Sequence, residues 1–404
     1  MRHATTSDLR PPTRRRVSPL VAAAGLLLAA GCAAGGGGAA GEASGVAEET
    51  LTVGVTNALT GAAGAVCAPF SNGTQAWFEH VNGQGGVAGR QIEYTVLDDA
   101  YSASRAVGNV RQLQNEPVFA VVGGCGTVQA GAIYSGLDEA GIPYLFPYAG
   151  LRDLIEPVKR NVFAMMPMYE DQINALVPFA FSERGPGSVY AAVNQWPGYE
   201  SAIANARDRA TEGGGTFAGE TVEEVGTTDY TPAALKVKAA GPDYVVVDMA
   251  GTDAVKFVDA LVAQQAVPRK AVLGVSTLAT KQFAGAYDTS VADRLLVASP
   301  LQLPAGEGSE CAAALESAGV EAEPATIYGC AQGLLFTEAV EQTQPLTREG
   351  LVATLEGFDE RTLDPALPPV SLSADDHLGL ENVFVVRLDG REFSTAAQVP
   401  ISAG

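Results

Sequence analysis

The segment "VFAVVGGCGTVQAG" (Val118–Gly131) joins a short apolar run, typical of a buried strand, to a stretch with helical character. A glycine-rich turn separates the two, and the helix is expected from about Thr127 to Ala140. Backbone N–H groups at such a helix N-terminus attract anions. The turn lacks the Gly-Lys-Ser/Thr ending of a phosphate loop and the full GxGxxG spacing of a dinucleotide site. Two readings remain: a plain anion site, or a tight turn in which Thr127 only caps its own helix.

Strand and helix patterns alternate on both sides of this segment. Runs such as "LTVGVT" (Leu51–Thr56) and "DYVVVDM" (Asp243–Met249) are each followed by a longer helical stretch. This alternation predicts βαβ units and parallel sheets. About ten strands are expected, which is too many for one ordinary domain of this design. We therefore predict an α/β fold of two doubly wound parallel-sheet lobes joined by a multi-strand hinge, with a boundary near Met165–Tyr169.

The composition argues against several classes of protein. The chain has 404 residues, of which 47% are hydrophobic, enough for the cores of two domains. A formal net charge of −21 repels nucleic acid and anionic lipid headgroups, so we expect neither as a partner. Apart from His3, the only histidines are His80 and His377, and no catalytic triad motif, HExxH or CxxC occurs. The sequence predicts a non-enzymatic protein without a metal site or cofactor.

The N-terminus has the pattern of an export signal. Arginines precede the apolar run Leu20–Ala30, which is too short to span a bilayer. The run leads into "LAAGC" (Leu28–Cys32), which resembles the lipobox of bacterial lipoproteins, with Ala29 at the usual leucine position. We expect residues 1–31 to be a lipoprotein signal peptide and Cys32 to carry the lipid. The protein is then exported and lipid-anchored to the outer face of the cytoplasmic membrane, and whether it uses the Sec or the twin-arginine route stays open.

The residues after Cys32 form a tether, and the remaining cysteines fit an exported protein. Residues 32–50 begin with a glycine- and alanine-rich stretch that has no apolar period, so they are expected to be a flexible tether. An even number of cysteines in an oxidising compartment predicts two disulfides, and three pairings are possible. These cysteines are Cys67, Cys125, Cys311 and Cys330.

Several segments together resemble the type I periplasmic binding proteins of the leucine/isoleucine/valine-binding class. The most specific are "VNGQGGVAGRQI" (Val81–Ile92) and "DDAYSASRAV" (Asp98–Val107), and "PPVSLSADDHLG" (Pro368–Gly379) is also similar. The resemblance runs from about Leu51 to the end of the chain. It implies the type I periplasmic binding protein fold. One lobe would comprise residues 51–168 with about 298–355, and the other residues 169–297 with about 356–404.

The same resemblance implies a function and partners. Proteins of this class are solute receptors of ABC importers, in which the lobes close on a small-molecule ligand by hinge motion. The implied partners are that ligand, an ABC permease with its ATPase, and the membrane through the lipid anchor. The alternative is a ligand-sensing receptor subunit for a membrane signalling partner, which would use the same cleft. Permease and ATPase genes beside this one would favour import, and a sensor kinase gene would favour signalling.

Ligand contacts follow from the resemblance position by position. Gly126 and Thr127 would hold a carboxylate, and the backbone of the loop around Ala149 would add hydrogen bonds. Trp196 and Tyr199 would be aromatic residues of the second lobe. The complete implied set is Val66, Gly126, Thr127, Tyr148, Ala149, Gly150, Trp196, Tyr199, Met249, Ala250 and Ser276.

Two positions depart from the amino-acid receptors of the class. Ser276 stands where those receptors carry a glutamate for the ligand ammonium, and Val66 stands where an aromatic wall is common. A hydroxyl cannot supply the charge that a buried ammonium needs. A carboxylate without an amine, an aromatic acid or an amide therefore fits better than a free branched-chain amino acid, unless Asp248 substitutes as the ammonium partner.

The resemblance also bears on the disulfides. In the usual strand order of the lobe, 2-1-3-4-5, the first and third strands are neighbours. Their carboxyl-end loops carry Cys67 and Cys125, which implies a bridge between these two residues. The remaining pair, Cys311 and Cys330, would then join two later helices.

Overall fold

The computed structural model describes residues 44–61, 63–287 and 289–401. The predicted signal peptide (residues 1–31), Cys32 and the first part of the predicted tether lie outside these residues. Within the described part of the tether, Val46 is buried in the main hydrophobic core and forms an isolated bridge with Leu51.

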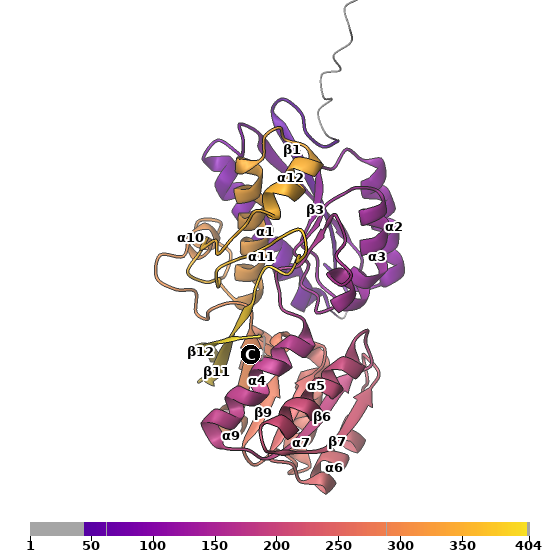
Figure 1. The fold of residues 1–404 in the computed structure, drawn as a ribbon, viewed down its shortest axis with the longest axis vertical. Coiled ribbons are helices and arrows are strands. Elements are labelled where there is room, and N and C mark those ends of the chain that lie inside the picture. The colour runs from indigo at the N-terminus through magenta and orange to yellow at the C-terminus, as the bar shows by residue number, and fades with distance from the viewer. Residues whose placement is uncertain (1–43, 62, 288, 402–404) are drawn as a thin grey trace, which may run out of the picture. The chain divides into compact units, whose positions relative to one another are not determined.

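The described strands form two sheets, and this confirms the predicted α/β architecture (Figure 1). The first sheet has five parallel strands in the order β2-β1-β3-β4-β5. Its order doubles back at β1, as expected of a doubly wound sheet. The strands are β1 (Thr50–Asn57), β2 (Gln91–Asp98), β3 (Ala120–Val122), β4 (Tyr144–Leu145) and β5 (Val162–Phe163).

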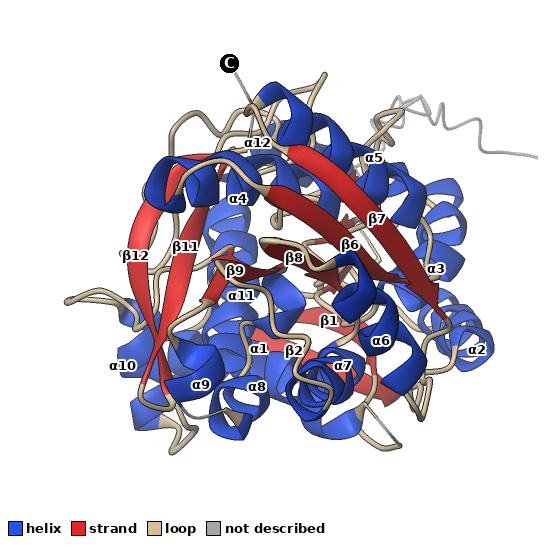
Figure 2. Ribbon diagram, turned by 90° about the horizontal axis from the view of Figure 1, so that it is seen from below, coloured by secondary structure: helices blue, strands red, loops and turns tan. Residues whose placement is uncertain are grey.

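The second sheet has seven strands in the order β12-β11-β10-β9-β8-β6-β7. Strands β6 to β10 are parallel, whereas β11 and β12 add an antiparallel edge. Figure 2 shows this sheet from below, with β12 at one edge and β7 at the other. The strands are β6 (Ser188–Asn194), β7 (Thr216–Glu223), β8 (Tyr244–Asp248), β9 (Ala271–Gly274), β10 (Leu295–Ser299), β11 (Asn382–Asp389) and β12 (Glu392–Pro400).

Helices cover both faces of each sheet, because successive strand residues point to opposite sides. In β3, Val121 belongs to one buried cluster with α2 and α3, whereas Ala120 and Val122 belong to the cluster that contains α1 and α11. We call the first sheet with its helices the first lobe and the second sheet with its helices the second lobe. First-lobe helices are α1 (Gly64–Gly83), α2 (Ala103–Asn115), α3 (Thr127–Glu139), α10 (Glu310–Ser317), α11 (Pro324–Gln342) and α12 (Arg348–Leu355). Second-lobe helices are α4 (Tyr169–Arg184), α5 (Tyr199–Glu212), α6 (Thr231–Ala240), α7 (Gly251–Ala263), α8 (Lys281–Ala286) and α9 (Thr289–Ala292).

Helix α11 comes from the C-terminal third of the chain but packs along α1 of the first lobe (Figure 1). Gly73 and Gly329 allow this close approach, since a Cβ on either would collide with the backbone of the opposite helix. Thr74 Oγ1 donates to the carbonyl oxygen of Gly329 at 2.8 Å, and Trp77 Nε1 donates to Thr337 Oγ1 at 2.9 Å. The core of the first lobe is therefore completed by residues distant in sequence.

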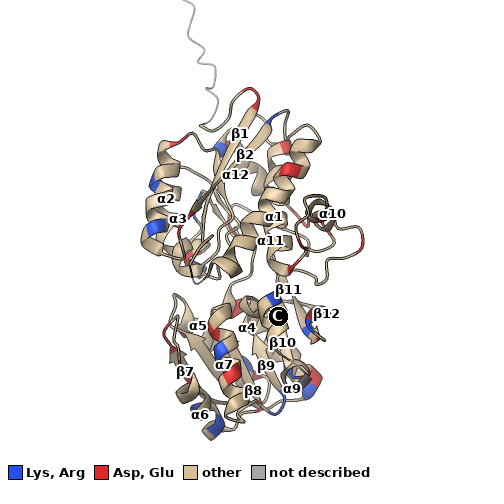
Figure 3. Cartoon of the chain, turned by 180° about the vertical axis from the view of Figure 1, so that it is seen from behind, with Lys and Arg blue, Asp and Glu red and all other residues tan. Residues whose placement is uncertain are grey.

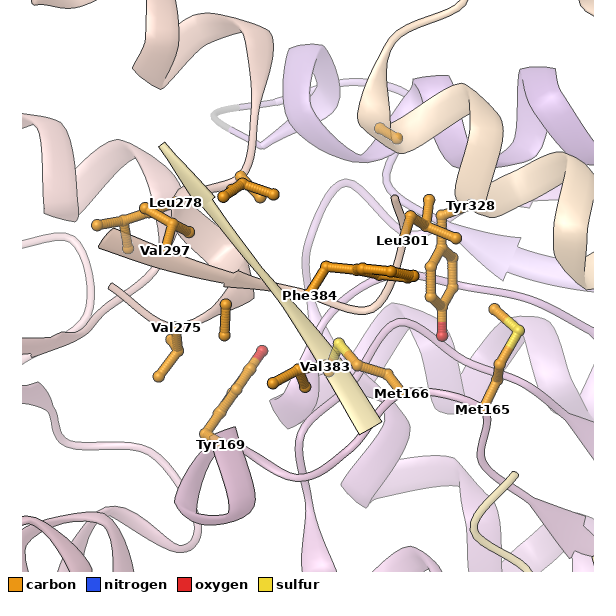
Figure 4. Close-up of a cluster of buried hydrophobic side chains, with 14 of the residues drawn as sticks. Met165, Met166, Tyr169, Val275, Leu278, Val297, Leu301, Tyr328, Val383 and Phe384 are labelled. Atoms are coloured by element: carbon orange, nitrogen blue, oxygen red, sulfur yellow. The ribbon is translucent and has the colours of Figure 1, made fainter. Parts of the chain in front are cut away.

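In the described part of the chain, the backbone crosses between the two sheets three times, after β5, after β10 and before β11 (Figure 1). All three crossings contribute to one apolar cluster with Tyr169 and Tyr328 (Figure 4). The first crossing supplies Met165 and Met166, the second supplies Leu301, and the third supplies Val383 and Phe384. The predicted multi-strand hinge is thus present, and its apolar residues belong to the main hydrophobic core.

The segment between α12 and β11 packs against the first lobe before the chain enters the second sheet. His377 is fully buried, its Nδ1 donates to the carbonyl oxygen of Val162 at 2.9 Å, and its ring stacks on Phe163. The residue limits predicted for the two lobes stay predictions.

Both cysteine pairings implied by the resemblance are confirmed. Cys67 on α1 is bonded to Cys125 in the β3–α3 loop, and Cys311 on α10 is bonded to Cys330 on α11. Acidic and basic residues occur on elements of both lobes (Figure 3). No helix among the described residues combines the length and apolar character needed to cross a membrane.

Candidate ligand-binding site

A cavity of about 440 Å³ lies at the carboxyl ends of the parallel strands and is lined by residues of both lobes. This is the position at which doubly wound sheets bind ligands, and the volume is typical of small-molecule sites. The lining consists of Ala63, Val66, Cys67, Phe70, Tyr101, Cys125, Gly126, Thr127, Tyr148, Tyr169, Trp196, Val225, Gly226, Ala250, Gly251, Thr252, Asp253, Lys256, Thr277 and Thr280.

Tyr101 reaches the cavity because an aspartate organises the turn between β2 and α2. Asp99 Oδ1 accepts the backbone N–H of Tyr101 at 2.8 Å, and Asp99 Oδ2 accepts Thr56 Oγ1 at 2.9 Å. This local side-chain-to-backbone bond holds Tyr101 at a positive φ of 61°. Burial, followed by the charges of Asp253 and Asp99, raises the pKa of Tyr101 to about 12, so its hydroxyl is neutral.

The N-terminus of α3 opens toward the cavity. Gly126 is the N-cap residue with φ of 120°, and no side chain caps the first turn. Thr127, 3% exposed, directs its hydroxyl to the hydroxyl of Tyr169 at 3.3 Å. The reading in which Thr127 only caps its own helix is therefore wrong. The α3 terminus keeps its backbone donors and partial positive charge available beside the cavity.

Aromatic side chains from the hinge and the second lobe form the next part of the lining. Tyr169 begins α4, and its ring stacks on Trp196 with a centroid distance of 5.1 Å. Trp196 Nε1 donates to Asp248 Oδ2 at 3.4 Å. Asp248 ends β8 and is 1% exposed, and its burial raises its pKa to about 8. Burial therefore favours the protonated, neutral form of Asp248, which lies behind Trp196.

The second lobe also contributes an acid and a base from the first turns of α7. The side chain of Asp253 is 1% exposed, and its Oδ2 accepts the backbone N–H of Gly226 at 2.7 Å. Lys256 Nζ lies 3.5 Å from Asp253 Oδ1 and donates to the carbonyl oxygen of Thr227 at 3.2 Å. These contacts tie the β7–α6 loop to α7 at the cavity edge.

Tyr148 connects the two lobes directly. Its ring lies 4.4 Å from the ring of Phe70, and its hydroxyl donates to the carbonyl oxygen of Ser276 at 2.8 Å. Tyr148 follows β4 in the first lobe, whereas Ser276 follows β9 in the second. The hydrogen bond therefore spans the cleft beside the cavity.

Six of the eleven residues predicted as ligand contacts line this cavity, and their contacts with a ligand stay predictions. They are Val66, Gly126, Thr127, Tyr148, Trp196 and Ala250.

The other five lie outside the lining, and their roles as contacts are likewise untested. Ala149 is fully buried, and Gly150 packs on the ring of Tyr169. Tyr199 begins α5 and is half-buried. Met249 is fully buried, and its carbonyl oxygen accepts Thr277 Oγ1 at 2.6 Å.

Ser276 is fully buried and its groups are engaged within the protein. Its backbone N–H donates to Gln172 Oε1 at 2.7 Å, and its hydroxyl lies 3.3 Å from Met166 Sδ.

The sequence reasoning missed several lining residues, above all Phe70, Tyr101, Tyr169, Asp253 and Lys256. Tyr101 lies in the turn between β2 and α2, and the spacing of Asp253 and Lys256 places them on one face of a helix that follows a strand. All three residues could therefore have been predicted from the sequence as lining residues.

Within the described residues, no group of three or more histidine, cysteine, aspartate or glutamate side chains is arranged to hold a metal ion.

The molecule is thus a two-lobed α/β protein with a cavity between the lobes. A model of the periplasmic binding protein family matches residues 50–393, so the chain belongs to that family. The chain is 25% identical over 202 residues to "Leu/Ile/Val-binding protein homolog 3" of Brucella melitensis, covering 48% of this chain and 53% of that protein. It spans about half the length of the curated relatives it matches.

Solved structures share the fold. One is a fatty acid ABC transporter substrate-binding protein from Thermomonospora curvata, with a TM-score of 0.79 and 18% identity, covering 90% of this chain and 95% of that one. Another is a branched-chain amino acid ABC transporter from Thermus thermophilus with bound valine, with a TM-score of 0.77 and 17% identity, covering 89% and 98%. The predicted type I periplasmic binding protein fold is confirmed.

Proposed function

We propose that this protein is an extracytoplasmic solute-binding lipoprotein of an ABC importer. It captures a small ligand that bears a carboxylate or an amide in the cavity between the lobes, and it catalyses no reaction. The partners in this proposal are the ligand, a membrane permease with its ATPase, and the membrane itself through a lipid on Cys32.

The N-terminus of α3 is the observation that carries the proposal. Gly126 lets a ligand approach the backbone closely, the first N–H groups of α3 have no capping side chain, and Thr127 adds a hydroxyl. These are neutral donors with partial positive charge, which match a carboxylate or an amide oxygen. The aromatic rings of Phe70 and Trp196 offer the apolar part of such a ligand a surface to pack on.

The relatives support the same role. Their printed names describe leucine/isoleucine/valine-binding proteins and substrate-binding proteins of ABC transporters, one for fatty acids and one with bound valine. All of these ligands carry a carboxylate. Closure around the ligand would use the three-crossing hinge between the lobes.

A thermal-shift screen tests the ligand class. The mature protein is melted with carboxylic acids, amino acids, amides and sugars, and each hit is measured by calorimetry. A ligand present at a thousandfold excess over its Kd stabilises the folded protein by about 4 kcal/mol, so a true ligand raises the melting temperature clearly. Stabilisation by sugars alone, with no response to any acid or amide, would refute the carboxylate or amide assignment.

Fractionation of cells tests the anchor. The wild-type chain should sediment with membranes, and a Cys32→Ala variant should be found in the soluble or secreted fraction, because a lipid chain is needed for stable attachment. Equal distribution of both forms would contradict the lipid anchor, yet it would leave the ligand proposal intact.

A further inference from the structure

Among the described lining residues of the cavity, only Asp253 and Lys256 carry a charge. Asp253 is 1% exposed, and both of its oxygens have partners within the protein: the N–H of Gly226 at 2.7 Å and Lys256 Nζ at 3.5 Å. The cavity therefore contains a carboxylate whose charge is already compensated by a base three residues further along the same helix.

Two other residues could have received an amino group, and neither is placed for it. Asp248 is outside the lining, behind Trp196, whose Nε1 donates to it at 3.4 Å, and its pKa is raised by burial. Ser276 is also outside the lining, with its hydroxyl beside Met166 Sδ and its backbone bonded to Gln172 and Tyr148.

An ammonium that leaves water for this cavity would thus meet no free negative charge, and the transfer of an uncompensated charge into a largely apolar site is costly. A carboxylate, in contrast, meets the uncapped N-terminus of α3 with Thr127. The cavity therefore offers hydrogen-bond donors to the carboxylate of an amino acid but no free anionic partner to its ammonium group.

We propose that the cavity selects carboxylic acids that lack an amino group, and that Lys256 determines this selectivity by occupying Asp253. The inference rests on the proposed function and narrows its ligand class. Lys256 is suited to this role because the carbonyl oxygen of Thr227 at 3.2 Å holds its Nζ beside Asp253, which is itself fixed by the Gly226 N–H at 2.7 Å. Removing the lysine charge would leave the Asp253 carboxylate in the lining without a cationic partner.

Matched pairs of ligands test the selectivity. 4-Methylpentanoate is compared with L-leucine, and 3-phenylpropanoate with L-phenylalanine, by calorimetry on the full mature chain. The acid of each pair should bind at least roughly tenfold more tightly, since one missing charged hydrogen bond amounts to that factor or more. Equal binding, or tighter binding of the amino acids, would overturn the inference but leave the receptor function standing. If neither member of either pair binds while sugars do, the carboxylate assignment itself fails, and this inference fails with it.

Variants of the charged pair test the role of Lys256. Lys256→Gln should raise the affinity for the amino acid relative to the matched acid by roughly tenfold. Lys238→Gln, an exposed change on α6 outside the lining, alters the net charge equally and should leave the ratio unchanged.

The double variant Asp253→Asn/Lys256→Gln should lose the gain again, because no carboxylate remains in the lining. Melting curves establish that each variant is folded. An unchanged ratio in folded Lys256→Gln, or the same gain in the double variant, would rule out Lys256 as the selectivity determinant.

Discussion

The wall of the cavity that the first lobe provides differs from the wall of the second lobe in chemistry and in support. The first-lobe wall presents the rings of Phe70, Tyr101 and Tyr148 and is tied by the Cys67–Cys125 bridge. The second-lobe wall presents the stacked rings of Tyr169 and Trp196, several glycine, alanine and threonine residues, and one charge-compensated pair at its edge.

This difference indicates that the two walls act at different stages of ligand binding. A wall that is cross-linked and held by turn hydrogen bonds can receive a ligand in the open form with little reorganisation. Small residues such as Gly226, Ala250 and Gly251 let the second wall approach the ligand closely with its backbone during closure. We therefore expect changes in the first wall to alter initial affinity and changes across the cleft to alter the lifetime of the closed complex.

The largest expected effect comes from the disulfides, of which only one touches the cavity. Cys67 and Cys125 are 58 residues apart, whereas Cys311 and Cys330 are 19 apart. Loop-closure entropy then predicts losses of about 4 and about 3 kcal/mol for replacing each pair by serine. Denaturant unfolding of the two double variants measures these losses.

Ligand titration of the same two variants shows which disulfide contributes to ligand affinity. Only Cys67→Ser/Cys125→Ser should weaken binding, because only that bridge holds the loop before Thr127. If the Cys311→Ser/Cys330→Ser variant lost affinity equally, the bridge would have no special part in the first wall.

Asp248 provides a test of the second lobe by pH. Its pKa is raised from 3.8 to about 8 by burial, so between these pH values the folded chain holds a proton that the unfolded chain has lost. The contribution of Asp248 to the free energy of unfolding therefore falls as pH rises from about 4 to about 8, and becomes flat above that. Asp248→Asn removes this contribution. Between pH 5 and pH 8, the free energy of unfolding of the variant should therefore rise relative to that of the wild type by more than about 2 kcal/mol. Urea unfolding at the two pH values checks this, and equal pH dependence of both proteins would contradict it.

Much of the fold and part of the first wall could be predicted from the sequence, because both follow from local patterns. The alternation of strands and helices predicted the two sheets. Gly126 and Thr127 were predicted as ligand contacts because they follow a strand at the start of a helix. Tyr148, which the resemblance implied as a ligand contact, lines the cavity, and its contact with a ligand stays a prediction; its hydroxyl bond across the cleft was not foreseen.

The second wall was harder to predict, because its lining depends on which side of a short loop faces the cleft. Thr277 lines the cavity, whereas its neighbour Ser276 is buried behind it. A shift of one residue decides whether a side chain lines the cavity or is buried behind the lining. The strand pattern in the sequence does not resolve a shift of that size. The pairing of Asp253 with Lys256 depends likewise on how the β7–α6 loop meets α7.

Thr127 is the next test of the first wall. Thr127→Ala should weaken ligand binding by about 1.5 kcal/mol, roughly tenfold, if its hydroxyl bonds the ligand. Thr127→Ser keeps the hydroxyl and is the matched control. Calorimetry with the best ligand of the screen measures both, and unchanged affinity in the alanine variant would remove Thr127 from the direct contacts.

Tyr148 offers the smallest expected effect and the most direct view of closure. Tyr148→Phe keeps the ring against Phe70 and removes only the hydrogen bond to the carbonyl oxygen of Ser276. Loss of one such bond is worth about 1 kcal/mol, so ligand dissociation should become roughly fivefold faster with little change in association. Stopped-flow measurements separate the two rates, and an effect confined to association would contradict the role of Tyr148 in the closed form.

The packing of α11 on α1 has a consequence for the order in which the molecule is assembled. A nascent chain emerges from its N-terminus, so α1 is available early, but the helix that covers it begins only at Pro324. Strands β6 to β10 and their helices form an uninterrupted stretch, residues 169–299, that is complete before then. We expect the first-lobe surface around Gly73 and Trp77 to stay uncovered until late in synthesis, and the second sheet to be completed later still, when β11 and β12 emerge.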